Sequence, residues 1–299
     1  MYKSLLRLSF SRLKALTNGI RSHPGLSRDN TPLVWKGFFW SIFVTLACDY
    51  DCDYCVQKFG FSKGRGDIAK FQSASPDKLL ELNKLEKVIE GRIPRAVITG
   101  GEPLLYKGLV QFLEGIRIFK QVCIVSNLSR DVEPVIELGL RRRDIKISFI
   151  GSYHSEFADF KTFVDKAKKL KDNGMLDYCD FVDLDYARSI RLLDSFERSG
   201  IRAYAYPFVG SKDGKVFPRR MRKSCDGKTI RTADCLMAAV LVAPDGRVFN
   251  CHAKLYKGRG QICSVDDFSE KFKFGYLRCE DYGLCHPCQG GLSRVENIR

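Results

Sequence analysis

The chain has 299 residues, with 50 Lys and Arg against 35 Asp and Glu, a formal net charge of +15, and 12 cysteines. With 44% hydrophobic and 28% charged residues it can bury a full core, which excludes a disordered chain and a disulfide-stapled miniprotein. The positive charge lies at the two ends: residues 1–40 carry +6 and residues 209–299 carry +7, which leaves +2 for the middle.

The N-terminal stretch 3–21 predicts a basic amphipathic helix, because apolar residues recur at helical spacing while Lys and Arg fall on another face. Such a helix packs against the rest of the protein or rests on an anionic membrane surface, and both remain open. Residues 22–32 predict a connecting loop, so residues 1–38 form an N-terminal helix with its linker. No stretch has the order of a secretory signal peptide, so we expect a reducing, cytoplasmic location, with peripheral membrane contact as an alternative.

The middle of the chain alternates short β-branched or aromatic runs with longer amphipathic stretches. The runs predict strands at 39–46, 95–99, 122–126, 145–150, 181–184 and 203–207. The stretches between them predict helices at 76–89, 109–119, 132–138, 157–173 and 187–199. Six strands alternating with helices predict a parallel α/β sheet over 39–208, open or curled into a partial barrel. The rhythm then stops, and the Gly-, Lys- and Cys-rich stretch 209–299 predicts a smaller, metal-stabilised unit.

Three cysteines, Cys48, Cys52 and Cys55, follow the first predicted strand at a CxxxCxxC spacing. Many cysteines in a reducing compartment favour metal or redox chemistry over disulfides. Three thiolates on one tight loop can hold three irons of a [4Fe–4S] cluster and leave the fourth iron open to an external ligand. A zinc loop would recruit a fourth protein ligand.

A glycine turn, Gly100, Gly101, Glu102 and Pro103, follows the second predicted strand. Glycines let the backbone approach a ligand closely, and a carboxylate accepts hydrogen bonds from an ammonium group. Alone, this turn has an ordinary structural explanation. Together, the cysteine loop and this turn on successive strands resemble the radical S-adenosylmethionine superfamily, over about residues 39–208.

The resemblance implies a partial (β/α)6 barrel of the TIM type and a [4Fe–4S] cluster whose open iron binds S-adenosylmethionine. In that family, reductive cleavage gives a 5′-deoxyadenosyl radical that abstracts hydrogen. The cluster ligands that the resemblance implies are Cys48, Cys52 and Cys55. The cofactor contacts that it implies are Tyr54 at the adenine, Gly100, Gly101, Glu102 and Pro103 around the methionine part, and Ser126, Asn127 and Ser148 near the ribose or carboxylate.

Seven further cysteines lie in the last third of the chain. Cys235 and Cys251 stand at the base of a predicted hairpin with its turn at Asp245-Gly246, which resembles the opening of the SPASM and twitch extensions of this family. The later family pattern is shortened here, which implies one auxiliary [4Fe–4S] cluster. Its preferred ligands are Cys235, Cys251, Cys285 and Cys288, with Cys279 able to replace one of them. A zinc ribbon with four cysteine ligands, and a second auxiliary cluster using Cys225, Cys263 and Cys279, remain alternatives.

Two residues stay open between a functional and a structural interpretation. In the functional interpretation, Cys225 donates a hydrogen atom in an epimerisation. In the structural one, it is a spare cluster ligand or an inert thiol. His154 follows the fourth predicted strand, at the end of the sheet where parallel-sheet enzymes place their chemistry. It would bind substrate or act as an acid, or it is a structural residue at the start of a helix. The basic run at 219–223 favours an anionic substrate or is a solvated face.

The resemblance leaves two substrate classes open. The preferred class is a carbohydrate-type or other small metabolite that is epimerised or dehydrogenated, because no winged-helix peptide-binding extension is recognisable. The alternative is a ribosomally made peptide. A flavodoxin- or ferredoxin-type protein is the expected electron donor. A non-catalytic zinc or nucleic-acid-binding protein is the alternative of another class, although the basic runs lack the interleaved aromatic residues that bind single-stranded nucleic acid.

Overall fold

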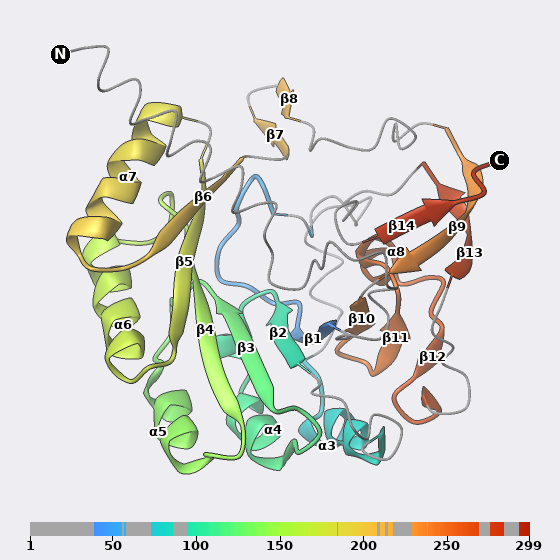
Figure 1. Ribbon diagram of the computed structural model, residues 1–299, viewed down its shortest axis with the longest axis horizontal. Coiled ribbons are helices and arrows are strands. Elements are labelled where there is room, and N and C mark those ends of the chain that lie inside the picture. Colours follow the sequence, from blue (N-terminus) through green and yellow to red (C-terminus); the bar gives the residue numbers. More distant parts are fainter. Residues whose placement is uncertain are drawn as a thin grey trace, which may run out of the picture.

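The computed structural model (Figure 1) describes residues 39–55, 57, 73–85, 95–183, 185–207, 210–212, 215–217, 229–237, 239–268, 276–283 and 293–299. The predicted N-terminal helix at 3–21 lies outside these residues. So do three of the cysteines singled out in the sequence, Cys225, Cys285 and Cys288.

A nine-stranded sheet, in the order β12-β11-β10-β1-β2-β3-β4-β5-β6, is the centre of the molecule. Strands β1 to β6 are parallel and lie side by side in chain order. Their bounds are β1 (Phe39–Thr45), β2 (Arg95–Gly100), β3 (Gln121–Ser126), β4 (Lys146–Tyr153), β5 (Leu176–Asp183) and β6 (Ala203–Pro207). The predicted α/β class and partial six-stranded barrel are confirmed.

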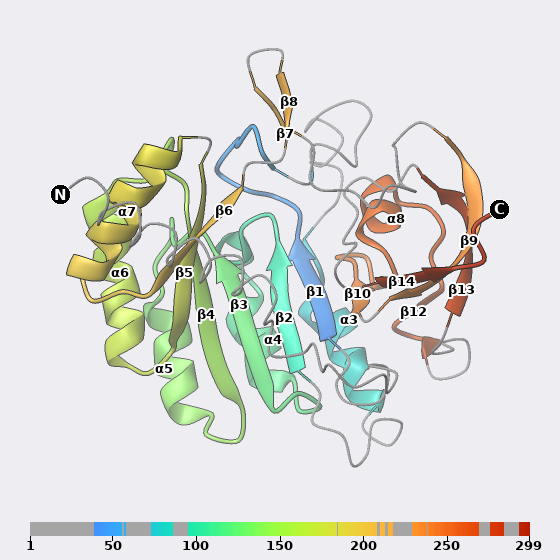
Figure 2. The ribbon, with the colours of Figure 1, turned by 45° about the horizontal axis from the view of Figure 1, so that its top comes forward.

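Helices cover one face of this sheet (Figures 1 and 2). They are α3 (Pro76–Leu80), which continues as the 3-10 helix η3 (Glu81–Leu85), then η4 (Pro103–Leu105), α4 (Leu109–Gly115), α5 (Glu133–Arg141), α6 (Phe160–Asp172) and α7 (Tyr186–Arg198). Alternate strand residues such as Ile42, Ile98 and Phe149 point toward the helices and are fully buried in the main hydrophobic core. The residues between them form the inner, concave face.

Two strand ends differ from their predicted positions. Strand β4 continues to Tyr153, three residues beyond the predicted end, and β5 begins at Leu176, five residues before the predicted start. In β5 the acidic residues Asp177 and Asp180 interrupt the apolar pattern, which hid the strand. Asp180 lies on the inner face, where no apolar side chain has to be buried, and Asp177 lies at an irregularity in the pairing of β4 with β5.

The last third of the chain divides between two sheets. The strands β9 (Arg231–Met237), β13 (Tyr276–Tyr282) and β14 (Ser293–Glu296) form an antiparallel sheet with β9 in the centre, and β7 (Gly210–Lys212) pairs with β8 (Lys215–Phe217). The strands β10 (Ala239–Val242), β11 (Arg247–Phe249) and β12 (Cys263–Ser264) join the main sheet. The main sheet therefore extends beyond the predicted boundary between residues 208 and 209.

The join is made by β10, which pairs in parallel with β1 from Phe39 opposite Ala239 to Ile42 opposite Val242. The predicted turn is present between β10 and β11, where Gly246 adopts a φ of +83° that favours glycine. Helix α8 (His252–Lys257) then packs on the inner face of β1. A second hydrophobic core holds these pieces together: Phe43, Leu46, Leu241, Ala243, Phe249, Leu255 and Tyr256.

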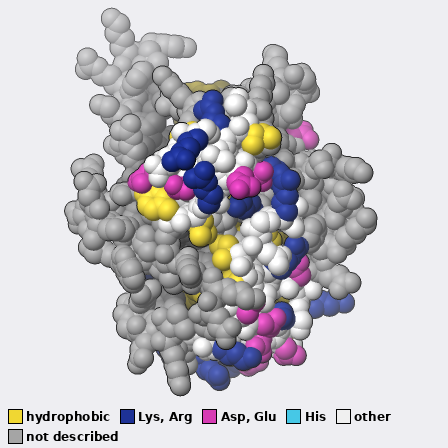
Figure 3. Space-filling view, turned by 90° about the vertical axis from the view of Figure 1, so that its right-hand side faces the viewer, with side chains coloured by type: hydrophobic (Ala, Val, Ile, Leu, Met, Phe, Trp, Pro, Cys, Tyr) yellow, Lys and Arg dark blue, Asp and Glu magenta, His cyan; other side chains and the backbone are white. Residues whose placement is uncertain are grey.

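Charges of both signs lie close together on the face that carries β9, β13 and β14 (Figure 3). Arg278 lies 3.6 Å from Asp234, and Arg259 lies 3.3 Å from Asp281. The described residues of this face therefore do not form a patch of one sign, although residues 209–299 carry +7. Within the described chain, no helix is both long enough and apolar enough to span a bilayer.

Candidate active site

The cysteine loop follows β1 directly. Cys52 is buried, Cys48 and Cys55 are half-buried, and none of the three forms a disulfide. The amide of Cys55 donates to the carbonyl of Cys52 over 3.1 Å, which closes a tight turn. Three thiols therefore stand on one short loop at the C-terminal edge of the sheet, where parallel strands place functional groups.

Two glycines hold the turn after β2 against this loop. The amide of Gly101 donates to the carbonyl of Thr45, and the amide of Glu102 donates to that of Ala47, both over 2.8 Å. A Cβ atom on Gly100 or Gly101 would lie 1.9 Å from the Thr45 or Ala47 oxygen, respectively. Gly100 also has a φ of +140°. The glycines therefore allow one segment of backbone to approach another, in addition to the approach to a ligand that the sequence suggested.

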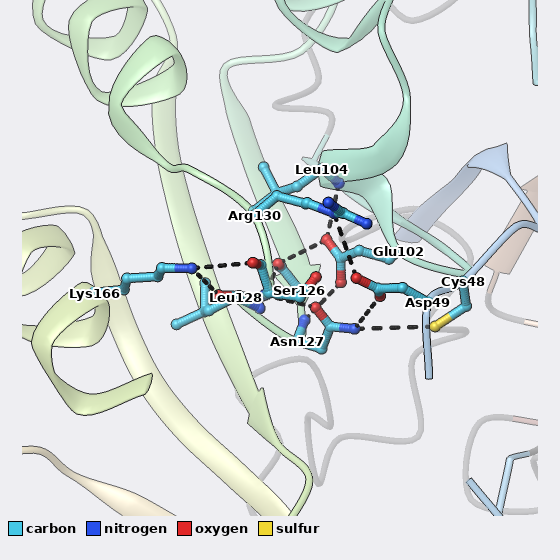
Figure 4. Close-up of polar contacts among 10 residues, drawn as sticks. Cys48, Asp49, Glu102, Leu104, Ser126, Asn127, Leu128, Arg130 and Lys166 are labelled. Atoms are coloured by element: carbon cyan, nitrogen blue, oxygen red, sulfur yellow. Dashed lines mark hydrogen bonds and ion pairs between the residues drawn. The ribbon is translucent and has the colours of Figure 1, made fainter. Parts of the chain in front are cut away.

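Glu102 joins the ends of β2 and β3 (Figure 4). Its Oε1 accepts from the Leu104 amide and the Ser126 hydroxyl, both at 2.8 Å, and its Oε2 accepts from the Asn127 amide at 2.7 Å. The residue is 1% exposed. Burial raises the pKa of Glu102 to about 7, although the three hydrogen bonds favour the carboxylate. One lone pair of Oε2 stays available to a further donor.

Asn127 connects this carboxylate network to the cysteine loop (Figure 4). Its Nδ2 donates to Asp49 Oδ1 over 3.0 Å and lies 4.0 Å from Cys48 Sγ. Arg130 Nε lies 3.4 Å from the other Asp49 oxygen. Burial opposes ionisation of Asp49, but hydrogen bonds from Asn127 and Ser129 and the charge of Arg130 bring its pKa below the usual value. Asp49 and Arg130 belong to no motif, and the sequence did not indicate them.

The turn after β3 is fixed from a distant helix. Lys166 on α6 donates to the carbonyls of Leu128 at 2.8 Å and Ser129 at 3.1 Å. Leu128 has a φ of +54°, an uncommon conformation for a residue with a side chain. The lysine thus satisfies two carbonyl groups that have no partner in a strand. These hydrogen bonds hold the turn that carries Asn127.

His154 lies against the cysteine loop from the end of β4. Its Nδ1 is 2.8 Å from the Tyr54 hydroxyl and 3.2 Å from Cys52 Sγ. The rings of His154 and Tyr54 are parallel, with centroids 5.7 Å apart, and Tyr50 meets His154 edge-on. Burial lowers the pKa of His154 to about 4, which favours the neutral ring. Tyr54, expected at the adenine, therefore also positions this imidazole.

Ser148 does not join the others. In the register of β3 and β4 it lies opposite Cys123, whereas Ser126 lies opposite Gly151. Its hydroxyl donates to Asp177 Oδ2 over 2.8 Å, deep on the inner face. Ser148 lies inside β4, as the sequence predicted, and its contact with the ribose or carboxylate stays a prediction. The other described candidates, from the cysteine loop to Asn127, come together at one edge.

The four described C-terminal cysteines lie at four different elements. Cys235 on β9 lies opposite Leu277 and Cys279 on β13 lies opposite Ala233, so the two cysteines occupy diagonal positions on one face of the sheet. Cys251 stands directly before α8. Cys263, by contrast, is buried in the main core. Cys235 and Cys279 thus lie within reach of one another, while Cys263 is directed elsewhere.

Helix α8 brings Cys251 into the neighbourhood of the first cysteine loop. Its His252 and Tyr256 rings both pack against Phe43 of β1, with centroids 5.6 and 6.0 Å away. Burial, reinforced by the nearby Cys55 thiol, raises the pKa of Tyr256. The start of α8, which carries Cys251, therefore packs beside the strand that leads into the first cysteine loop.

The donor set fits a [4Fe–4S] cluster with three protein ligands. Among the described residues, no three His, Cys, Asp or Glu side chains converge on a point that could hold a single metal ion. A cubane does not require such convergence, because each thiolate binds its own iron. The close approach of the Gly100–Gly101 backbone and the remaining acceptor site of Glu102 suit an amino acid ligand beside such a cluster.

Comparison with known families identifies one match. The family model of the radical SAM superfamily matches residues 42–185. This stretch holds the cysteine loop, the glycine turn and Asn127, together with most of β1 and all of β2 to β5.

Curated proteins named GTP 3′,8-cyclase are similar in sequence. The protein of Alkaliphilus oremlandii is 28% identical over 119 residues, which cover 36% of this chain and 34% of that protein. That of Clostridium perfringens is 23% identical over 223 residues, which cover 64% and 65%. The chain spans about a third of the length of the first of these relatives.

Solved structures share the fold. Native anSMEcpe with bound AdoMet has a TM-score of 0.54 and 13% identity, with 78% of this chain and 80% of that chain covered. Streptococcus suis SuiB bound to S-adenosylmethionine has a TM-score of 0.52 and 14% identity, with 88% and 75% covered. Both likenesses concern the architecture alone.

Proposed function

We propose that this chain, whose residues 42–185 match the family model of the radical SAM superfamily, is a radical SAM enzyme. In this proposal it cleaves S-adenosylmethionine reductively and abstracts hydrogen from a small carbohydrate-type metabolite. The observation that carries the proposal is the convergence of the cysteine loop, the Gly-Gly-Glu turn and Asn127 at one edge of the sheet. The family implies a [4Fe–4S] cluster and S-adenosylmethionine, which when bound supply the reductive cleavage and the 5′-deoxyadenosyl radical.

Within this proposal, the chain's own residues bind, orient and exclude water. Cys48, Cys52 and Cys55 hold three irons. The turn from Gly100 to Pro103 receives the methionine part, with Glu102 accepting from its ammonium group through the remaining lone pair. Asn127 and the neutral His154 fix the loop through their contacts with Cys48 and Cys52.

The decisive test is anaerobic reconstitution with iron and sulfide, followed by reduction in the presence of S-adenosylmethionine. The protein should turn brown and release 5′-deoxyadenosine. Changing Cys48, Cys52 and Cys55 to Ala should abolish the release, while Cys179→Ala, at a core cysteine of β5, serves as the matched control. A colourless zinc protein that does not cleave S-adenosylmethionine would refute the proposal.

We further propose one auxiliary [4Fe–4S] cluster in the C-terminal part. The shared face of Cys235 and Cys279 supports including Cys279 beside Cys235, with Cys251, Cys285 and Cys288 as the remaining candidates. Cys235→Ser and Cys279→Ser should each lose the irons of one cluster, measured by iron analysis and electron paramagnetic resonance. Cys263→Ser is the control, because this thiol lies in the main core. Equal iron in all three variants would refute the ligand assignment.

Cys225 remains the candidate hydrogen donor for an epimerisation. A thiol in this role exchanges its hydrogen with water, so reaction in deuterium oxide should place deuterium in the product. Cys225→Ala should stop this incorporation while reductive cleavage continues. Incorporation that survives in Cys225→Ala would exclude this residue as the donor.

A second candidate function is rearrangement of a purine nucleotide, favoured by the relatives named GTP 3′,8-cyclase. Incubation of the reconstituted enzyme with GTP distinguishes it, because only this function consumes the nucleotide. Maturation of a ribosomally made peptide is the remaining alternative. A flavodoxin- or ferredoxin-type protein is the proposed electron donor and can replace the chemical reductant in the same assay.

A further inference from the structure

The inner face of β4, β5 and β6 carries polar and aromatic side chains that the proposed chemistry does not use. On each strand the alternate residues pack into the main core: Phe149 on β4, Cys179 and Phe181 on β5, and Ala203 and Ala205 on β6. Because side chains alternate between faces, the residues between them lie on the inner face. They are Ser152, Tyr178, Asp180, Val182, Tyr204 and Tyr206.

The strand register places Asp180 at the level of the candidate active site. Ser126, which binds Glu102, lies opposite Gly151, and Gly151 lies opposite Cys179. Asp180 is one residue closer to the C-terminal edge and lies opposite Ser152. It is two strands from β3, or about 9.5 Å at the usual spacing of neighbouring strands. Asp180 therefore faces the concave side of the barrel beside the proposed S-adenosylmethionine site.

Among the described residues, Asp180 is a carboxylate without a cationic partner. Its hydrogen bond is with Ser152, and no Lys or Arg among the described residues forms an ion pair with it. Burial raises its pKa to about 6, since the carboxylate loses water without gaining a positive charge. The residue is nevertheless only half-buried, so part of its surface is open to the inner face. An ammonium or hydroxyl group of a ligand would supply the missing partner.

Three tyrosines surround this carboxylate. The rings of Tyr178 and Tyr204 meet edge to face, with centroids 5.1 Å apart, and the Tyr178 and Tyr206 hydroxyls are hydrogen-bonded. Aromatic faces bind cations and the apolar faces of sugar rings, and their hydroxyls both donate and accept. Two cations lie near the described inner face: Lys146 begins β4, six residues before Ser152, and the Arg202 guanidinium lies over the Tyr204 ring, 5.4 Å from its centroid. Neither forms an ion pair with Asp180 among the described residues, so the carboxylate and the hydroxyls at this level suit an amine.

We infer that Asp180 is a substrate-recognition residue that binds an ammonium or hydroxyl group of a small polyhydroxylated amine, such as an amino sugar, with Ser152 and the tyrosines Tyr178, Tyr204 and Tyr206 as its surroundings. The inference rests on the proposed function, because the proposed S-adenosylmethionine site determines at which end of the barrel the substrate would bind. A cationic or neutral substrate is an alternative to the anionic substrate that the basic run at 219–223 favours, and that run lies outside the described residues.

The test compares four probes on the reconstituted enzyme with S-adenosylmethionine bound: glucosamine, glucose, glucose 6-phosphate and GTP. Dissociation constants are measured by calorimetry or ligand-observed NMR. We expect glucosamine to bind at least about tenfold more tightly than either phosphate, a difference of about 1.4 kcal/mol. Asp180→Asn should reduce glucosamine binding to the level of glucose.

Asp177→Asn is the matched control, because Asp177 lies on the same strand and binds Ser148, farther from the site. It should keep the preference for glucosamine. Iron content and thermal midpoint report whether each variant is folded. A preference for GTP or glucose 6-phosphate, an unchanged preference in Asp180→Asn, or no binding of any probe would overturn the inference. Failure of the proposed function is separate, since it appears as absent cleavage of S-adenosylmethionine by the parent protein.

Discussion

Gly100 has no side chain, and this allows the turn after β2 to contact the backbone that leads into the cysteine loop. The clash distance of 1.9 Å is to a backbone oxygen, which cannot move aside as a flexible side chain can. Gly174 also has a positive φ, of +69° against +140° at Gly100, but nothing lies within 4 Å of a Cβ there. The two positions separate the effect of backbone conformation from the effect of close approach.

Gly100→Ala should therefore prevent iron loading, because the turn would push the cysteine loop away from β2. We expect a loss of about 3 kcal/mol in the free energy of unfolding. Gly174→Ala should cost about 1–2 kcal/mol through its conformation alone and retain full iron content. Chemical denaturation and iron analysis measure the two effects, and equal iron in both variants would contradict the role of close approach.

Glu102 gives a pH dependence with a defined sign. Its pKa is raised by burial from the ordinary 4.5 to about 7, so the folded chain without ligands binds a proton more tightly than the unfolded chain. The resulting stabilisation is complete below about pH 4.5 and is lost as the pH rises through about 7. The free energy of unfolding of the apoprotein should fall over this range more steeply than that of Glu102→Gln. Parallel curves would show that this carboxyl group does not titrate as described.

The sequence was sufficient for the cysteine loop and the glycine turn because each is contiguous and ends a strand. It left His154 open, since the contact of this ring with Cys52 joins positions 102 residues apart. The end of β4 was predicted three residues too early, because pairing with its neighbours rather than local composition sets that end. Asp180 was missed because an acidic residue on an inner barrel face looks like a break in an apolar strand.

Among the elements, helix α7 shows how the outer layer is attached to the sheet. Its Phe196 is fully buried, and its ring stacks on that of Phe181 of β5 with centroids 6.0 Å apart. Phe160 of α6 and Tyr153 of β4 meet the same ring edge-on. One aromatic side chain thus links two helices and two strands, and β4 and β5 are the strands that carry the inferred recognition residues.

Phe196→Ala should lower the free energy of unfolding by about 3–5 kcal/mol, because it leaves a cavity among several rings. Phe196→Leu keeps most of the volume and should cost less. Thermal and chemical denaturation of both variants give the comparison. A similar loss in the two would show that the edge-on ring contacts, rather than the filled volume, dominate.

At the scale of the whole molecule, the C-terminal part packs against the β1 edge of the parallel sheet. Strands β10 and β11 extend the sheet at the edge of β1, and α8 covers the inner side of β1; a shared core that includes Phe43, Leu241 and Phe249 joins them. The sequence predicted a separate unit beyond residue 208 because the alternation of strands and helices stops there. It did not indicate that β10 returns to the edge of β1, since such a pairing depends on distant residues.

A chain ended at residue 208 should therefore not unfold cooperatively, because Phe43 and Leu46 would lose their partners. A chain ended at residue 268 retains β10 to β12 and should keep a cooperative transition. Circular dichroism during heating distinguishes the two. A cooperative transition in the shorter chain would show that the six parallel strands form an independent domain.

The pairing of β1 with β10 has a consequence for the order of events during synthesis. About 200 residues separate the two strands, which a ribosome takes roughly 10–40 s to add. During that interval the first strand has an open edge, and the thiols that follow it are already outside the ribosome. Iron delivered to the nascent chain during this interval would meet a site without its neighbouring strand, so we expect productive loading only after β10 has been synthesised.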